Sequence, residues 1–166
     1  MAKVYHAPED TGPEWNKCIR DPENPIFLAG SINMGAASDW QKQIIEALSD
    51  CNVTIYNPRR HDWDPTWEQS IYNGNFVEQV QWELDHLDKA DYLVFVFDKD
   101  GPSPITLMEL GRHAHESPDY KDIFVCCPEG FWRKGNVDIL CARHGIPVYE
   151  TVEELIGALR YELGYD

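Results

Sequence analysis

The chain has 166 residues, enough for one domain with a proper core and too few for two comfortable domains. Hydrophobic residues make up 43% of it and aromatic residues 12%, which favours a folded globule over a disordered chain. Its formal net charge of -15 at pH 7 repels phosphate backbones and argues against a nucleic acid polymer as partner, while a small ligand stays compatible with it.

The sequence also indicates where the protein resides. No apolar run approaches the length of a bilayer-spanning helix, and residues 1–21 lack the apolar segment of a signal peptide. The five cysteines include no C-x-x-C pair, a pattern typical of small buried residues in a reducing compartment and not of zinc sites or disulfides. We therefore expect a cytoplasmic protein with no membrane partner.

The first third of the chain predicts an arm, two strands and a helix. Residues 1–25 carry several prolines among polar residues and are expected to form an irregular arm. Residues 26–29 predict a short buried strand, and the loop 30–35 follows it. Residues 38–49 predict a helix that begins with a capping-box pattern, and residues 53–56 predict the second strand.

The middle of the chain contains its most unusual segment. Residues 57–67 are rich in aromatic residues and in both signs of charge, and they suit no regular element. Long structured loops in compact domains tend to be functional. Residues 75–89 then predict a helix, and residues 92–97, the most apolar run, predict a buried strand.

The second half continues the same alternation. Its predicted helix, strand, helix, strand and helix lie at residues 103–116, 123–127, 137–144, 145–149 and 151–161. This pattern predicts an α/β fold, with one doubly wound domain over residues 26–166 that has a five-stranded parallel sheet and helices on both faces. In such sheets ligands bind beyond the carboxyl ends of the strands, where the strand order reverses.

Glu109 is the first candidate for chemistry. Ser103 has the side chain of an N-cap, and Pro104 suits the first helical position because its missing N–H has no partner there in any case. Glu109 then falls in the second turn, next to Met108 and near the positive end of the helix dipole. An arbitrary helix glutamate is usually solvated. Its place after a buried strand, at the ligand edge of the sheet, favours a functional role here.

Glu83 is the second candidate. It shares helical spacing with Phe76, Val80 and Leu87, so its carboxyl is either desolvated on an apolar stripe or placed at the border of that stripe, facing water. A desolvated carboxyl has a raised pKa and suits proton delivery. Two acids of different environment, one ionised and one protonated, form the machinery for cleaving a glycosidic bond.

Several segments together resemble the nucleoside 2-deoxyribosyltransferase superfamily, which also contains the 2-deoxynucleoside 5-monophosphate N-glycosidases. They span residues 26–111, and the most specific is the E-L-G at the start of the predicted helix. The matching segments are Phe27-Leu28-Ala29-Gly30-Ser31-Ile32, Glu83-Leu84 through Ala90-Asp91, and Ser103 through Met108-Glu109-Leu110-Gly111.

The resemblance implies a flavodoxin-like fold, Glu109 as nucleophile, and an acid eight residues before Asp91, which here is Glu83 in place of the usual Asp. Family transferases usually place an Asp six residues before the nucleophile. Ser103 stands there in this chain, as in the monophosphate hydrolases, where that serine helps to hold phosphate. The resemblance further implies nucleosides and nucleobases as ligands, no cofactor, and a homo-oligomer whose sites are completed by a neighbouring subunit.

Substrate contacts are expected along the same edge of the sheet. The expected substrate-binding residues are Gly30, Ser31, Ile32, Asn57, Arg59, Trp63, Ser103 and Met108. Arg59 and Arg60 can bind a 5-phosphate bidentately or pair with surface acids, and we favour a structural role for at least one of them. Trp63 can stack on a nucleobase or anchor its loop. His61, Asp62 and Asp64 are not completed into a metal site by a second cluster, so no metal is expected.

We expect an enzyme that cleaves the N-glycosidic bond of 2-deoxynucleosides and passes the sugar, through a covalent intermediate on Glu109, to another base. Glu83 would assist proton transfer. Transfer requires that water be excluded, and the loop 57–67 is the candidate for that role. The first alternative is a deoxynucleoside 5-monophosphate hydrolase, suggested by Ser31 and Ser103. The second is a nucleotide-sensing module without turnover, against which the two carboxylates argue.

Overall fold

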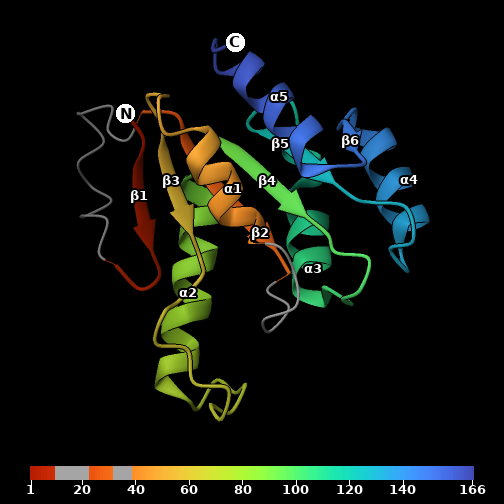
Figure 1. Ribbon diagram of the computed structural model, residues 1–166. Helices are drawn as coiled ribbons and strands as arrows, with labels where there is room; N and C mark the ends of the chain where they lie inside the picture. The colour runs from red at the N-terminus through yellow and green to blue at the C-terminus, as the bar shows by residue number, and fades with distance from the viewer. Residues whose placement is uncertain (10–22, 32–38) are drawn as a thin grey trace.

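The computed structural model describes residues 1–9, 23–31 and 39–166 (Figure 1). Within these residues six strands form one sheet, in the spatial order β1-β3-β2-β4-β5-β6, and every neighbouring pair is parallel. The strands are β1 (Lys3–His6), β2 (Pro25–Gly30), β3 (Thr54–Asn57), β4 (Tyr92–Val96), β5 (Asp122–Cys126) and β6 (Val148–Tyr149). The predicted α/β class is confirmed, and the predicted number of five strands is wrong.

The additional strand comes from the segment that we expected to be irregular. In β1, Lys3 pairs with Thr54 and His6 pairs with Asn57, so the strand extends the sheet at its β3 edge. It is four residues long and mostly half-buried, so its own sequence carries little hydrophobic signal. The valine and tyrosine it contains favour a strand only once a neighbouring strand is present to pair with. Residues 10–22 of the expected arm lie outside the described part.

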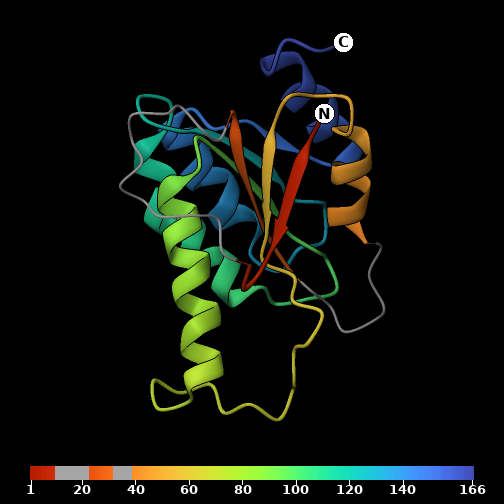
Figure 2. The same ribbon diagram turned by 90° about the vertical axis from the view of Figure 1, so that its left-hand side faces the viewer.

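Helices cover both faces of the sheet, as the alternation of elements predicted (Figures 1 and 2). On one face pack α1 (Trp40–Ala47) and α5 (Val152–Glu162). On the other pack α2 (Gly74–Lys89), α3 (Pro104–His113), the short 3-10 helix η1 (Ala114–Glu116) and α4 (Lys134–His144). Figure 2 shows α2 and α1 on opposite sides of the sheet. None of the helices in the described residues is long and apolar enough to span a membrane.

The order of the strands places the ligand edge. From β2 the chain crosses to β3 on one side, and then returns to form β4 on the other side of β2. The connections after β2 and β4 therefore leave in opposite directions, which marks the switch point where open α/β sheets bind ligands. At this point the N–H of Ser31 donates to the carbonyl oxygen of Val96 over 3.4 Å, so the two strand ends lie side by side.

α2 is rotated relative to the prediction, and this rotation matters for the site. Its buried residues are Gln79, Trp82, His86 and Leu87. Of the expected stripe only Leu87 is buried, while Phe76 and Val80 are half-buried. The reason is Trp82, whose large ring packs 6.4 Å from the rings of both Phe27 and Tyr56 and occupies the inner position. The rotation carries Gln79 to the sheet.

Candidate active site

Glu109 lies in the second turn of α3 and is almost completely buried, with 6% of its surface exposed. Burial, together with the neighbouring Glu83 carboxylate, raises the pKa of Glu109 to about 8. We expected an ionised group near the positive end of a helix dipole. Loss of water and the neighbouring carboxylate instead outweigh the dipole, so Glu109 is largely protonated at pH 7.

Glu83 lies on α2 and faces the same site from a second helix. Burial raises the pKa of Glu83 to about 7, against an opposing hydrogen bond from Gln79. Because Glu83 also raises the pKa of Glu109, the two carboxyls from α2 and α3 lie close enough to titrate as a pair. Between about pH 7 and pH 8 the pair therefore shares one proton. Glu83 is half-buried, which lies between the two interpretations, and its raised pKa favours the desolvated one.

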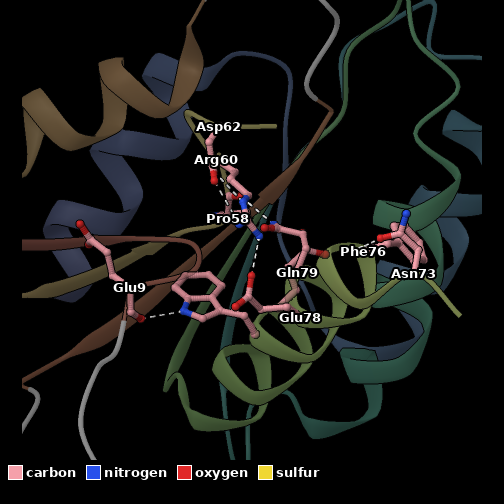
Figure 3. Close-up of polar contacts among 10 residues, drawn as sticks. Glu9, Pro58, Arg60, Asp62, Asn73, Phe76, Glu78 and Gln79 are labelled. Carbon is pink, nitrogen blue, oxygen red and sulfur yellow. Dashed lines mark hydrogen bonds and ion pairs between the residues drawn. The ribbon is translucent and has the colours of Figure 1, made fainter. Parts of the chain in front are cut away.

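Gln79 holds the Glu83 carboxyl and was missed in the sequence. Its side-chain Nε2 donates to Glu83 Oε1 over 2.6 Å and to the carbonyl oxygen of Pro58 over 2.9 Å. Figure 3 shows Gln79 beside Pro58, at the point where the loop after β3 approaches α2. The only signal in the sequence is its position one helical turn before Glu83, which places both side chains on one face.

Ser31 and Ser103 meet at the switch point. Their hydroxyls are hydrogen-bonded to each other, and Ser103 is buried. Ser103 stands at the N-cap of α3 as predicted, but its side chain does not cap the helix, and its backbone φ of 45° lies in the left-handed region. Residues other than glycine adopt that region at a cost and often at functional sites. Ile32, the next expected contact, lies outside the described residues.

Gly30 is required by close packing. A Cβ atom at this position would lie 2.6 Å from the carbonyl oxygen of Val96 and 2.5 Å from the ring of Trp40. The Trp40 ring then donates from Nε1 to the carbonyl oxygen of Ser31 over 3.1 Å. Gly30 therefore supports the site by letting two strand ends and an indole approach each other, so that Ser31 can reach Ser103.

Asn57 and Arg59 begin the loop that follows β3. Asn57 is buried, and its Oδ1 accepts the backbone N–H of Arg59 over 3.0 Å, which is a local turn contact. The Arg59 side chain forms an ion pair with Asp39, the N-cap residue of α1, over 3.0 Å. Both partners are about half-exposed. Arg59 therefore lies at the rim of the site and is already paired.

Arg60 has a structural role, as we favoured for at least one of the two arginines. Its side chain is only 6% exposed and binds Asp62 over 2.7 Å and Glu78 of α2 over 3.0 Å (Figure 3). Its guanidinium also lies 5.0 Å from the ring of Trp67, which packs edge-on against Trp63. These contacts fix the loop on α2, and Trp63 contributes to that anchor.

Two further side chains, Met108 and Trp132, lie on α3 and against the loop that precedes it. Met108 lies on α3 with 60% of its surface exposed, so it is not brought to the carboxyl pair within this chain. Trp132 was missed, although it follows β5 at the same edge of the sheet. Its Nε1 donates to the carbonyl oxygen of Pro102 over 3.0 Å, which ties the loop before α4 to the loop before α3.

The described residues contain no group of three or more His, Cys, Asp or Glu side chains that could hold a metal ion. His61 packs its ring 5.1 Å from that of His6. The coupled titratable pair of the site is Glu83 and Glu109.

Comparison with known proteins bears on these residues. A family model described as "Nucleoside 2-deoxyribosyltransferase like" matches residues 23–131, well over half of the chain. The matched range contains Ser31, Glu83, Ser103 and Glu109, and it extends from β2 to the loop before α4. Comparison with curated proteins gives no match. On the strength of the family match, the chain belongs to the nucleoside 2-deoxyribosyltransferase-like family.

Proposed function

We propose that this protein cleaves the N-glycosidic bond of 2-deoxynucleosides and transfers the deoxyribosyl group to another nucleobase. The observation that carries the proposal is the pair of desolvated, electrostatically coupled carboxyls, Glu83 and Glu109, contributed by two helices to the ligand edge of the sheet. Burying two acids opposes folding, since desolvation disfavours their charged forms. A module that only senses nucleotides has no need of such a pair.

In the pair without substrate the shared proton lies mainly on Glu109, which has the higher pKa. In the proposed reacting form this proton has moved to Glu83, and the Glu109 carboxylate attacks the anomeric carbon of the sugar. The bond from that carbon to the base nitrogen breaks, and its electron pair stays on the base, which takes the proton held by Glu83. The product is a deoxyribosyl ester of Glu109 and a free base. A second base then attacks the same carbon and releases Glu109, while Glu83 takes the proton that the incoming base loses.

The pairing of the two arginines favours nucleosides over their 5-monophosphates. A phosphate dianion is held well when charge-assisted hydrogen bonds reach it, at about 1.5–3 kcal/mol each. Arg60 is held by Asp62 and Glu78, and Arg59 is held by Asp39. To bind phosphate, either arginine would first have to leave an existing acidic partner. We therefore propose that Ser31 and Ser103 contact the sugar.

The test is incubation of the purified protein with deoxyinosine, with and without free adenine. We expect deoxyadenosine to form when adenine is present, and little free deoxyribose without it. Glu109→Gln should lower turnover by several orders of magnitude. Glu46→Gln, the same change at an exposed position of α1 across the sheet, serves as matched control and should leave it unchanged. Near wild-type turnover of Glu109→Gln would exclude Glu109 as nucleophile.

The hydrogen-bonded hydroxyls of Ser31 and Ser103 specifically favour a second candidate, a deoxynucleoside 5-monophosphate N-glycosidase. In that enzyme both hydroxyls would donate to phosphate, and water would replace the second base. Comparing kcat/KM for deoxyadenosine and its 5-monophosphate separates the two candidates. We expect the nucleoside to be preferred. A tenfold preference for the monophosphate, lost in Arg59→Ala, would favour the hydrolase.

We also propose that the protein acts as a homo-oligomer. Ile105 and Met108 lie exposed on α3, and Ile71 and Tyr72 lie exposed just before α2. Each of these two pairs is formed by neighbours within its own segment, and exposed apolar patches are typical of interaction surfaces. A neighbouring subunit is also the means by which Met108 would reach a substrate. Light scattering of the wild type should give a mass that is a multiple of the 19.2 kDa chain mass. In Met108→Glu the measured mass should be lower. A wild-type monomer would contradict the proposal.

A further inference from the structure

Gln79 occupies an unusual position for an amide side chain. It is 5% exposed, on the face of α2 that packs against the sheet. Its Nε2 is shared between the carbonyl oxygen of Pro58 and Glu83 Oε1. A backbone carbonyl can only accept a hydrogen bond, so Pro58 fixes which end of the amide is the NH₂ group. The second N–H is thereby directed at Glu83.

We propose that Gln79 is a positioning residue that occupies Oε1 of Glu83, so that the proton exchanged with the base resides on Oε2, and that Pro58 maintains this arrangement. The inference rests on the function proposed above. An oxygen that already accepts an N–H at 2.6 Å has no room for a proton on the same side. The Gln79 N–H takes one of the two lone pairs of Oε1, so the proton is favoured on Oε2, and turning the carboxyl would break this hydrogen bond.

The unsatisfied end of the same amide supports this role. Gln79 Oε1 is buried and has no hydrogen-bond partner among the described residues. An unsatisfied buried acceptor opposes folding, and an apolar side chain of similar length at this position would avoid it. The amide is therefore best explained by its two donor contacts, which an apolar residue cannot make.

Pro58 makes the position of Glu83 depend on the loop after β3. The same loop is also held by Glu78, the residue before Gln79 on α2, which binds Arg60 of the loop (Figure 3). Among the described residues, the titratable group that faces Glu83 from α3 is Glu109, and the loop presents the uncharged Pro58 carbonyl. If the loop moves away, Gln79 loses the acceptor that orients it, and Glu83 loses its donor.

The test is a titration of the Glu83 carboxyl by carbon-13 NMR in the protein without substrate, with the signal assigned by its loss in Glu83→Gln. Gln79→Met removes the donor at similar length, so the midpoint should rise by about half to one pH unit. Gln81→Met makes the same change at an exposed position of the same helix and should leave the midpoint unchanged. Should Gln79→Met fail to fold, Gln79→Asn shortens the amide and should raise the midpoint too.

The activity profile provides a second readout. In Gln79→Met the pH optimum should move to higher pH, and kcat should fall most for bases that leave poorly, while Gln81→Met matches the wild type. A midpoint and optimum that both stay in place would overturn the inference and leave Gln79 a structural residue. A midpoint that moves in a protein without turnover would keep the role of Gln79 and refute the proposed function instead.

Discussion

Replacing Glu109 with Gln should stabilise the folded protein at neutral pH while it removes the proposed nucleophile. Glu109 is buried, and its pKa is raised from 4.5 to about 8. A carboxyl whose folded pKa is raised stabilises the fold in its protonated form. That contribution is fully present below the unfolded pKa of 4.5, and it is lost as the pH rises through about 8.

The size of the effect follows from the two pKa values. At 1.36 kcal/mol per pH unit, the change from 4.5 to about 8 corresponds to about 5 kcal/mol once the group is ionised in both states. Between pH 5 and pH 8 the unfolded chain is ionised at this position while the folded chain still holds the proton. The wild type should lose about 3 kcal/mol of stability over this interval through Glu109 alone.

Urea unfolding of wild type, Glu109→Gln and the control Glu46→Gln at pH 5, 6, 7 and 8 measures this directly. The free energy of unfolding of Glu109→Gln relative to wild type should rise by about 3 kcal/mol from pH 5 to pH 8. The difference for Glu46→Gln should stay constant. Parallel curves for Glu109→Gln and wild type would refute the conclusion that burial raises the pKa of Glu109.

Three further predictions concern the surrounding residues. Glu83→Gln should slow poor leaving groups far more than good ones, and an equal loss for all bases would indicate a structural role. Arg60→Met removes a buried guanidinium whose two acidic partners are exposed, and the lost charged hydrogen bonds should destabilise the fold by about 1.5–3 kcal/mol in urea. Arg59→Met breaks a half-exposed pair worth about 0–1 kcal/mol, and equal effects of the two changes would contradict the assignment. Gly30→Ala places a Cβ against the Val96 carbonyl and should lower stability by about 1–3 kcal/mol, and an unchanged urea midpoint would argue against that contact.

Local patterns predicted the features that local forces determine. The apolar run that became β4 needs only its own composition to be recognised. The helix predicted at residues 151–161 begins with a capping box made by neighbouring residues, in which Thr151 accepts from the Glu154 N–H and the Glu154 side chain accepts from the Thr151 N–H. The helix start at Pro104 was predicted for the same reason.

The features that were missed depend on contacts distant in sequence. β1 is a strand because β3 lies beside it, and its own residues carry little signal. The rotation of α2 follows from where Trp82 finds room against the sheet. Gln79 gains its importance from Pro58, a loop residue far from it in the chain. The periodicity of one segment cannot predict any of these features, because the segment that it contacts in the fold lies elsewhere in the chain.

The pKa values of the carboxyl pair bear on why transfer suits this site. A transferase has to give a proton to the departing base and recover one from the incoming base, so the same group serves in both directions. A carboxyl with an ordinary pKa of 4.5 would hold almost no proton at pH 7, whereas burial raises the pKa of Glu83 to about 7. The coupling between Glu83 and Glu109 keeps a single proton on the pair near neutral pH. When Glu109 forms the proposed ester it loses its charge, so burial and the Gln79 hydrogen bond alone set the pKa of Glu83. With a pKa of about 7, Glu83 can give its proton to the departing base and take one back from the incoming base at neutral pH.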